Sequence, residues 1–294
     1  MTDRARERIL VATDLSPCSD TAVEIADKWA KQQDADLLVM HVLNVMPPVS
    51  MLFPLTADDQ VGPFDLLRQK AAQAVGERVA KLTGRDEHGF DVIIGSGTPY
   101  AEIVREAEAQ KAKLVIAGAR GSTGIARMLL GHQASKIARY AHCPALVVRP
   151  SPNTGRVLVT SDLSDHSAVA IRAAASYAKS QAATLTALHV VDTTMPFPLD
   201  AGPGTGELLP VADALRKRAA DDLRKQLDAL GITAMMEVRE GPVSTAIAEM
   251  AESLPAELVV VGTVGRTGLA RVALGNTAES LIQLLHCSVL VVRG

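Results

Sequence analysis

The residues of this chain whose types and spacing are best suited to binding an anion are six glycines in two similar segments. Each segment has a Gly-x-x-Gly pair, then nine residues, then a third glycine. Glycine allows the main chain to approach a ligand closely, and a helix that begins at the third glycine offers unpaired N–H groups to a phosphate. The alternative is that these glycines only form tight turns and helix ends. The six residues are Gly118, Gly121 and Gly131 in the first segment and Gly262, Gly265 and Gly275 in the second.

Two further residue types recur close to the first and second apolar runs of each half of the chain. Asp14 and Asp162 each begin an Asp-x-Ser sequence, which suits the cap of a following helix and is also compatible with contact to a ligand. His41 and His189 end the next apolar run. Because no nucleophile or matched acid accompanies them at a recognisable spacing, we interpret them as strand-end histidines with local hydrogen bonds rather than as general bases.

Charge and cysteine content exclude several classes of function. The formal net charge of −3 leaves no excess of basic residues, so we expect neither nucleic acid nor a membrane surface as a partner. The first residues lack an apolar signal-peptide core, which predicts a cytoplasmic protein. Cys18, Cys143 and Cys287 are too far apart for a zinc knuckle and are expected to be reduced thiols. Two of them form His-Cys pairs before the last apolar run of each half, where packing is favoured over metal binding.

The elements that must position these residues occur twice, because the chain is an internal repeat. Asp14 recurs as Asp162, and 162 − 14 = 148. The glycine segments recur with a smaller offset, 262 − 118 = 144, so the second repeat lacks four residues between the aspartate and the glycine segment. We predict two domains, residues 1–150 and 151–294, joined by the turn-rich segment 150–155.

Within each repeat, apolar runs alternate with amphipathic stretches. An apolar stripe from Ala22 to Ala30 has helical spacing, and the same pattern recurs in the second half. The pattern predicts an α/β protein with two tandem, doubly wound, five-stranded parallel-sheet domains. Ligands of such sheets bind at the carboxyl ends of the strands where the winding reverses. In the first domain we expect strands at 9–13, 37–42, 91–94, 113–117 and 145–148, with helices around 66–82, 100–110 and 133–141.

The repeated motifs resemble those of the universal stress protein family, of the tandem type. The resemblance rests on the glycine spacing, on the Asp-x-Ser turn, on the His-Val pair that ends the second run, and on the last runs CPALVV and CSVLVV. It covers almost the entire chain twice. It implies the adenine nucleotide alpha hydrolase-like fold and, in the family's nucleotide-binding members, ATP as the ligand, alone or with Mg²⁺.

The resemblance also implies which residues hold the nucleotide. Asp14 and Val42 would meet the adenosine, and the glycines would surround the ribose and phosphates. The residue after the third glycine is Ser or Thr in nucleotide-binding members, whereas it is His132 in the first domain and Asn276 in the second. The lost hydroxyl hydrogen bond is worth about 1 kcal/mol, so affinity should fall several-fold unless the hydroxyl of Thr277 replaces it. The counterparts in the second domain are Asp162, Val190, Gly262, Gly265 and Gly275.

These features predict a stress-response regulatory protein that binds ATP in one or both domains and is at most a slow ATPase. Protein partners or self-association are compatible with this role, and in the family the last strands of two units pair edge to edge. The alternative is a carrier or sensor of a lipid-like or other apolar small molecule without ATP binding. It would use two proline-rich loops with apolar tips, residues 51–55 and 195–199.

Overall fold

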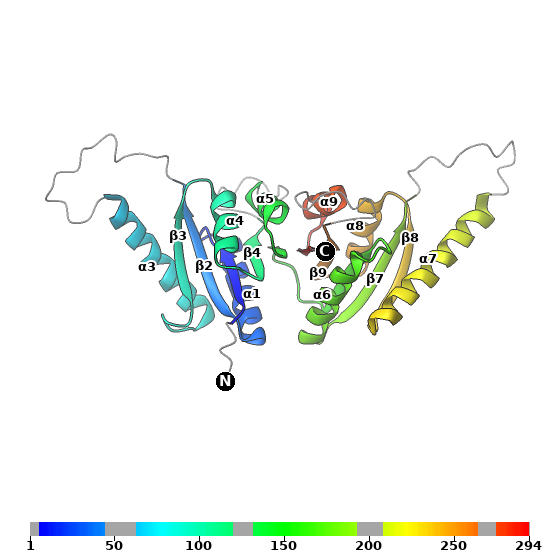
Figure 1. Ribbon diagram of the computed structural model, residues 1–294, viewed down its shortest axis with the longest axis horizontal. Helices are drawn as coiled ribbons and strands as arrows, with labels where there is room; N and C mark the ends of the chain where they lie inside the picture. Colours follow the sequence, from blue (N-terminus) through cyan, green and yellow to red (C-terminus); the bar gives the residue numbers. More distant parts are fainter. Residues whose placement is uncertain (1–5, 45–62, 120–131, 193–207, 264–274, 294) are drawn as a thin grey trace. The chain divides into compact units, whose positions relative to one another are not determined.

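The computed structural model describes residues 6–44, 63–119, 132–192, 208–263 and 275–293. The chain divides into two units, Met1–Pro150 and Ser151–Gly294. Each unit contains a parallel sheet with helices on both faces (Figure 1).

The sheet of unit 1 has the strand order β3-β2-β1-β4-β5, and every described pair is parallel. Helices α1 and α3 pack on one face, and α4 and α5 pack on the other. The elements in chain order are β1 (Arg8–Ala12), α1 (Pro17–Gln33), β2 (Asp36–Leu43), α3 (Pro63–Thr83), β3 (Asp91–Ser96), α4 (Pro99–Ala109), β4 (Leu114–Gly118), α5 (His132–Tyr140) and β5 (Ala145–Val148).

Unit 2 repeats this arrangement with the strand order β10-β9-β6-β7-β8. Helices α6 and α7 share one face, and α8 and α9 share the other. The elements are β6 (Arg156–Ser161), α6 (Ser167–Ser180), β7 (Thr184–Val191), α7 (Leu208–Leu230), β8 (Met235–Glu240), α8 (Val243–Ser253), β9 (Leu258–Gly262), α9 (Asn276–Leu284) and β10 (Ser288–Val292). The predicted fold class, two tandem doubly wound parallel sheets, is therefore confirmed.

Strands β4 and β10 are mostly apolar because helices pack on both of their faces. Every residue from Leu114 to Ala117 is buried, and so is every residue from Ser288 to Val292. Helix α1 buries Ala22, Ala26 and Ala30 of the predicted stripe. It also buries Asp27, which the apolar pattern does not predict.

The described helices include none that is both long and apolar enough to cross a membrane.

Candidate functional site

The candidate site lies at the carboxyl ends of two neighbouring strands in each unit. In unit 1, β1 is paired with β4, and Ala12 is the register partner of Ala117. The chain leaves β1 toward β2 and leaves β4 toward β5, so the winding of the sheet reverses between β1 and β4. Asp14 follows β1 and Gly118 ends β4, which brings the two predicted site residues to this reversal point.

Unit 2 places the corresponding residues in the same way. Strand β6 is paired with β9 and the winding reverses between them. Asp162 follows β6 directly, and Gly262 ends β9. Two segments that are about a hundred residues apart in the sequence therefore meet at one edge of the sheet in both units.

The turn that carries the aspartate is held in an unusual backbone conformation. Asp14 Oδ1 accepts a hydrogen bond of 3.1 Å from the Ser16 N–H, and Asp162 Oδ1 accepts one of 3.1 Å from the Ser164 N–H. The leucine between each pair is left-handed, with φ of 63° at Leu15 and 64° at Leu163. Such a conformation costs about 1–2 kcal/mol for a residue with a side chain. Its presence in both units means that the turn is firmly imposed, as is common at ligand sites.

The next element, α1, begins at the end of this turn. Ser16 is its N-cap, with an extended backbone, and its side chain accepts a hydrogen bond from the Ser19 N–H at 3.3 Å. In unit 2 the hydroxyl of Ser164 is 2.6 Å from Asp162 Oδ1, to which it donates. The predicted capping use of the Asp-x-Ser sequence is thus present in unit 1, whereas in unit 2 the N-cap of α6 is His166, which makes no side-chain capping hydrogen bond.

The two strand-end histidines hold the same turn from the neighbouring strand. His41 Nδ1 lies 2.8 Å from the main-chain oxygen of Thr13, and His189 Nδ1 lies 2.8 Å from that of Ser161. Because a carbonyl oxygen only accepts, Nδ1 carries the proton in both rings. The bonds are structural, as predicted, although each partner is 28 residues away rather than local.

The first glycine of unit 1, Gly118, has a packing role that the spacing did not indicate. A Cβ atom added to Gly118 would lie 3.1 Å from the carbonyl oxygen and 3.2 Å from the carbonyl carbon of Cys18. The first turn of α1 therefore approaches the end of β4 so closely that only glycine fits without a shift. This glycine positions α1 whether or not a ligand is bound.

The third glycine of unit 2 begins a helix, as predicted. Gly275 is the N-cap of α9, and its N–H donates to the main-chain oxygen of Thr263 at 3.2 Å. Asn276 is the exposed first residue of α9, and Thr277 is its half-buried second residue. The unpaired N–H groups of this helix start therefore begin at Asn276 rather than at the glycine.

The same helix start in unit 1 is described only in part. His132 is the first residue of α5. Gly131 lies outside the described residues, as do Gly121 and Gly265 and the two apolar loop tips at 51–55 and 195–199.

The predicted adenosine contacts at the ends of β2 and β7 differ between the units. Val42 is half-buried against the core of unit 1, and its register partner on β3 is Gly95. Val190 is also half-buried, but its partner on β8 is Arg239, which is exposed and lies 3.8 Å from the carboxylate of Glu237. The sequence gives no signal for this arginine, because the repeat offset pairs Arg239 with Gly95.

The His-Cys pairs direct their two side chains to different environments. His142 is exposed and Cys143 is 6% exposed, inside the core cluster of unit 1. His286 has a side chain that is 73% exposed, and Cys287 is 6% exposed. In the part of the chain that the structure describes, no three His, Cys, Asp or Glu side chains gather as metal ligands would.

Comparison with known proteins agrees with the repeat. The model of the universal stress protein family matches the chain twice, at residues 5–149 and 153–293. A universal stress protein of Mycolicibacterium smegmatis is 29% identical over 306 residues, which cover 97% of this chain and 96% of that protein. One from Methanocaldococcus jannaschii is 36% identical over 141 residues, or 47% of this chain and 81% of that protein.

A solved structure shares the fold. The crystal structure of a universal stress protein from Archaeoglobus fulgidus superposes with a TM-score of 0.64 at 21% identity, and the match covers 97% of this chain and 98% of that chain. With two family matches that together span nearly all of its residues, this chain belongs to the universal stress protein family and carries two of its domains in tandem.

Proposed function

We propose that this chain is a stress-response regulatory protein that binds an adenine nucleotide, ATP, at the carboxyl edge of the sheet in one or both units. The observation that carries the proposal is the meeting of an aspartate turn and a glycine segment at the reversal point of the winding. It occurs with Asp14 and Gly118 in unit 1 and with Asp162 and Gly262 in unit 2. Clefts at this point are where open α/β sheets bind ligands.

The chemistry at this edge suits the two ends of a nucleotide. The carboxylates of Asp14 and Asp162 are acceptors for the hydroxyl or amino groups of an adenosine. The first N–H groups of α9 and the positive end of its dipole suit a phosphate. Because the Gly275 N–H is already bonded to Thr263, the phosphate contacts of unit 2 fall to Asn276 and Thr277.

The proposed role of the nucleotide is regulatory. A nucleotide held between the aspartate turn and the helix start bridges two segments that are far apart in the sequence. Its binding therefore favours one arrangement of these segments, which can bias conformation or the choice of a protein partner.

The decisive variant is a double change, His132→Asp with Asn276→Asp. An acidic residue in the first turn stabilises a helix, so neither change should harm the fold. The new carboxylates stand at the first residues of α5 and α9, beside the proposed phosphate position, and like charges there should lower ATP affinity by at least about tenfold. Isothermal titration calorimetry with ATP, in Mg²⁺ and in EDTA, measures the effect and whether the metal matters.

The control is Asn153→Asp, which makes the same chemical change as Asn276→Asp at an exposed position of the segment between the units. Its ATP affinity should equal that of the unmodified protein. The proposal fails if ATP does not bind at millimolar concentration, and the placement fails if the double variant binds ATP as well as the control. Mass spectrometry of ligands released from the purified protein tests the alternative, since an apolar carrier should retain an apolar ligand and no nucleotide.

A further inference from the structure

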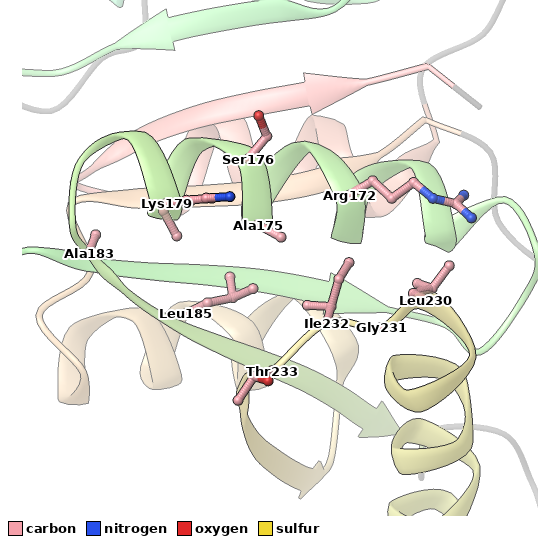
Figure 2. Close-up of a pocket in the computed structure, with 11 residues that line it drawn as sticks. Arg172, Ala175, Ser176, Lys179, Ala183, Leu185, Leu230, Gly231, Ile232 and Thr233 are labelled. Atoms are coloured by element: carbon pink, nitrogen blue, oxygen red, sulfur yellow. The ribbon is translucent and has the colours of Figure 1, made fainter.

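Unit 2 contains a pocket that lies away from the proposed nucleotide site. It is formed by α6, the start of β7, the end of α7 and the segment that follows α7 (Figure 2). Its volume is about 550 Å³, which is within the range of small-molecule sites. It lies at the amino end of β7, whereas the aspartate turns and helix starts lie at the carboxyl ends of the strands.

The corresponding place in unit 1 is crossed by an ion-pair network. Asp27 on α1 is 8% exposed at its side chain and bonds Arg85 Nε at 2.5 Å and Lys31 Nζ at 2.8 Å. Arg85 also donates to the main-chain oxygen of Gly89 at 2.6 Å. These side chains fasten α1 to the segment that follows α3.

Unit 2 has lost both ends of that network. By the repeat offset, Asp27 corresponds to Ala175 (27 + 148 = 175). Arg85 corresponds to Ile232, because each directly follows the left-handed glycine at the end of a helix, Gly84 after α3 and Gly231 after α7. Ala175 is a half-buried residue of the pocket wall. Ile232 also lines the pocket, so a methyl group and an apolar side chain stand where unit 1 has a carboxylate and a guanidinium.

One cation of the network remains, and a second has been added. Lys31 corresponds to Lys179, while Glu24 corresponds to Arg172, so the charge at the latter position is reversed. Arg172 and Lys179 are exposed, line the pocket, and lie two turns apart on α6, about 10 Å by helix geometry. Neither takes part in an ion pair within the described portion of the chain.

The rest of the wall is apolar or neutral. Leu185 at the floor is 7% exposed, and Leu230 and Ile232 are half-buried beside it. The residues that line the pocket include no Asp or Glu. We propose that this pocket binds a small amphipathic anion, a carboxylate on a short hydrocarbon body, with the carboxylate at Arg172 or Lys179 and the hydrocarbon over the leucine floor.

The test uses decanoate as the probe and decanol as its neutral counterpart, below the concentration at which decanoate forms micelles. In methyl-labelled full-length protein, decanoate should shift the NMR signals of Leu185, Leu230 and Ile232 in a saturable way. Decanol should bind at least about tenfold more weakly, because it lacks the charge that the two cations recognise. Equal binding of decanol, or shifts located elsewhere, would overturn the proposal.

Two variants separate the charge from the cavity. Arg172→Gln with Lys179→Gln should lower the affinity for decanoate at least about tenfold. The control, Arg216→Gln with Lys217→Gln, removes the same charge from exposed positions of α7 and should leave the affinity for decanoate unchanged. Ala175→Leu should fill the pocket and weaken both probes. Unchanged decanoate binding in the Arg172/Lys179 variant contradicts the proposal. These outcomes do not depend on ATP binding, because the pocket is at the other end of the strands.

Discussion

His189 Nδ1 lies 2.8 Å from the main-chain oxygen of Ser161, which fastens the end of β7 to the turn that carries Asp162. The histidine is 7% exposed, so the bond is shielded from water. The same contact joins His41 to the main-chain oxygen of Thr13 in unit 1. The position of each candidate aspartate is therefore set from two strands rather than from its own turn alone.

Replacing His189 by a residue of similar volume tests how much this hydrogen bond contributes to stability. His189→Phe leaves the buried oxygen of Ser161 without its donor and should lower the free energy of unfolding by about 1–3 kcal/mol. Urea denaturation measures the loss. His286→Phe is the control, since the His286 side chain is 73% exposed, and equal stability of the two variants would contradict the role given to His189.

A methyl group at Gly118 should destabilise the protein without any ligand. In Gly118→Ala the new Cβ would lie 3.1–3.2 Å from main-chain atoms of Cys18, so α1 must shift, at a cost of about 1–3 kcal/mol. Gly76→Ala, inside α3, meets no atom within 4 Å and should stabilise by about 0.5–1 kcal/mol. The denaturation midpoint should therefore be lower for Gly118→Ala and higher for Gly76→Ala than for the unmodified protein. If Gly118→Ala is as stable as the unmodified protein, the close approach of α1 is not a constraint.

This packing role limits what glycine variants can say about the nucleotide. A bulky residue at Gly118 would displace the first turn of α1 and with it the turn at Asp14. Loss of ATP binding in such a variant would have two explanations. The acidic variants at the helix starts avoid that ambiguity, because they leave the end of β4 unchanged.

The sequence was sufficient to predict the architecture, since the signals for it are periodic and local. Apolar runs, helical stripes and the repeated landmarks predicted the strand and helix ranges to within about three residues in unit 1. The turn chemistry at Asp14 was also predictable, because an aspartate and a serine two residues apart carry their own hydrogen bond.

Long-range pairing was not predictable from one sequence. Asp27 lies in the helix of the apolar stripe but is not part of the stripe, so its charge suggests exposure, and its partner Arg85 is 58 residues away. The left-handed leucines and the reason for a glycine at Gly118 depend on contacts between elements that periodicity does not encode. The pocket of unit 2 lies where that unit lacks the same pair, so periodicity does not predict the pocket either.

The Asp27–Arg85 pair should matter more than an exposed ion pair. The side chains are 8% and 17% exposed, so Asp27→Ala leaves a largely buried guanidinium without its carboxylate and should cost about 2–4 kcal/mol. Asp213→Ala removes an exposed partner of Arg216 and should cost less than about 0.5 kcal/mol. Urea denaturation compares the two, and similar small losses would mean that the buried network adds nothing to stability.

The stability of unit 2 should fall in alkaline solution through Tyr177. Burial, then the negative charge of Glu257, then a hydrogen bond of 3.5 Å to that carboxylate raise the pKa of Tyr177 from its ordinary value of 10.0 to about 12. In the unfolded chain the phenol loses its proton near pH 10, whereas in the folded protein it keeps the proton to about pH 12. The folded state then binds more protons than the unfolded state between these values, so the free energy of unfolding must decrease as the pH rises through this window.

Tyr177→Phe removes the titrating group and should make the stability less dependent on pH above 10. Urea denaturation at pH 9 and at pH 11 gives the two slopes, and the unmodified protein should lose more stability between them than the variant does. At pH 9 the two proteins have the same charge on this side chain, so the comparison isolates the ionisation from any change in packing. Parallel losses in both proteins would show that the phenol of Tyr177 is not held in its neutral form by the fold.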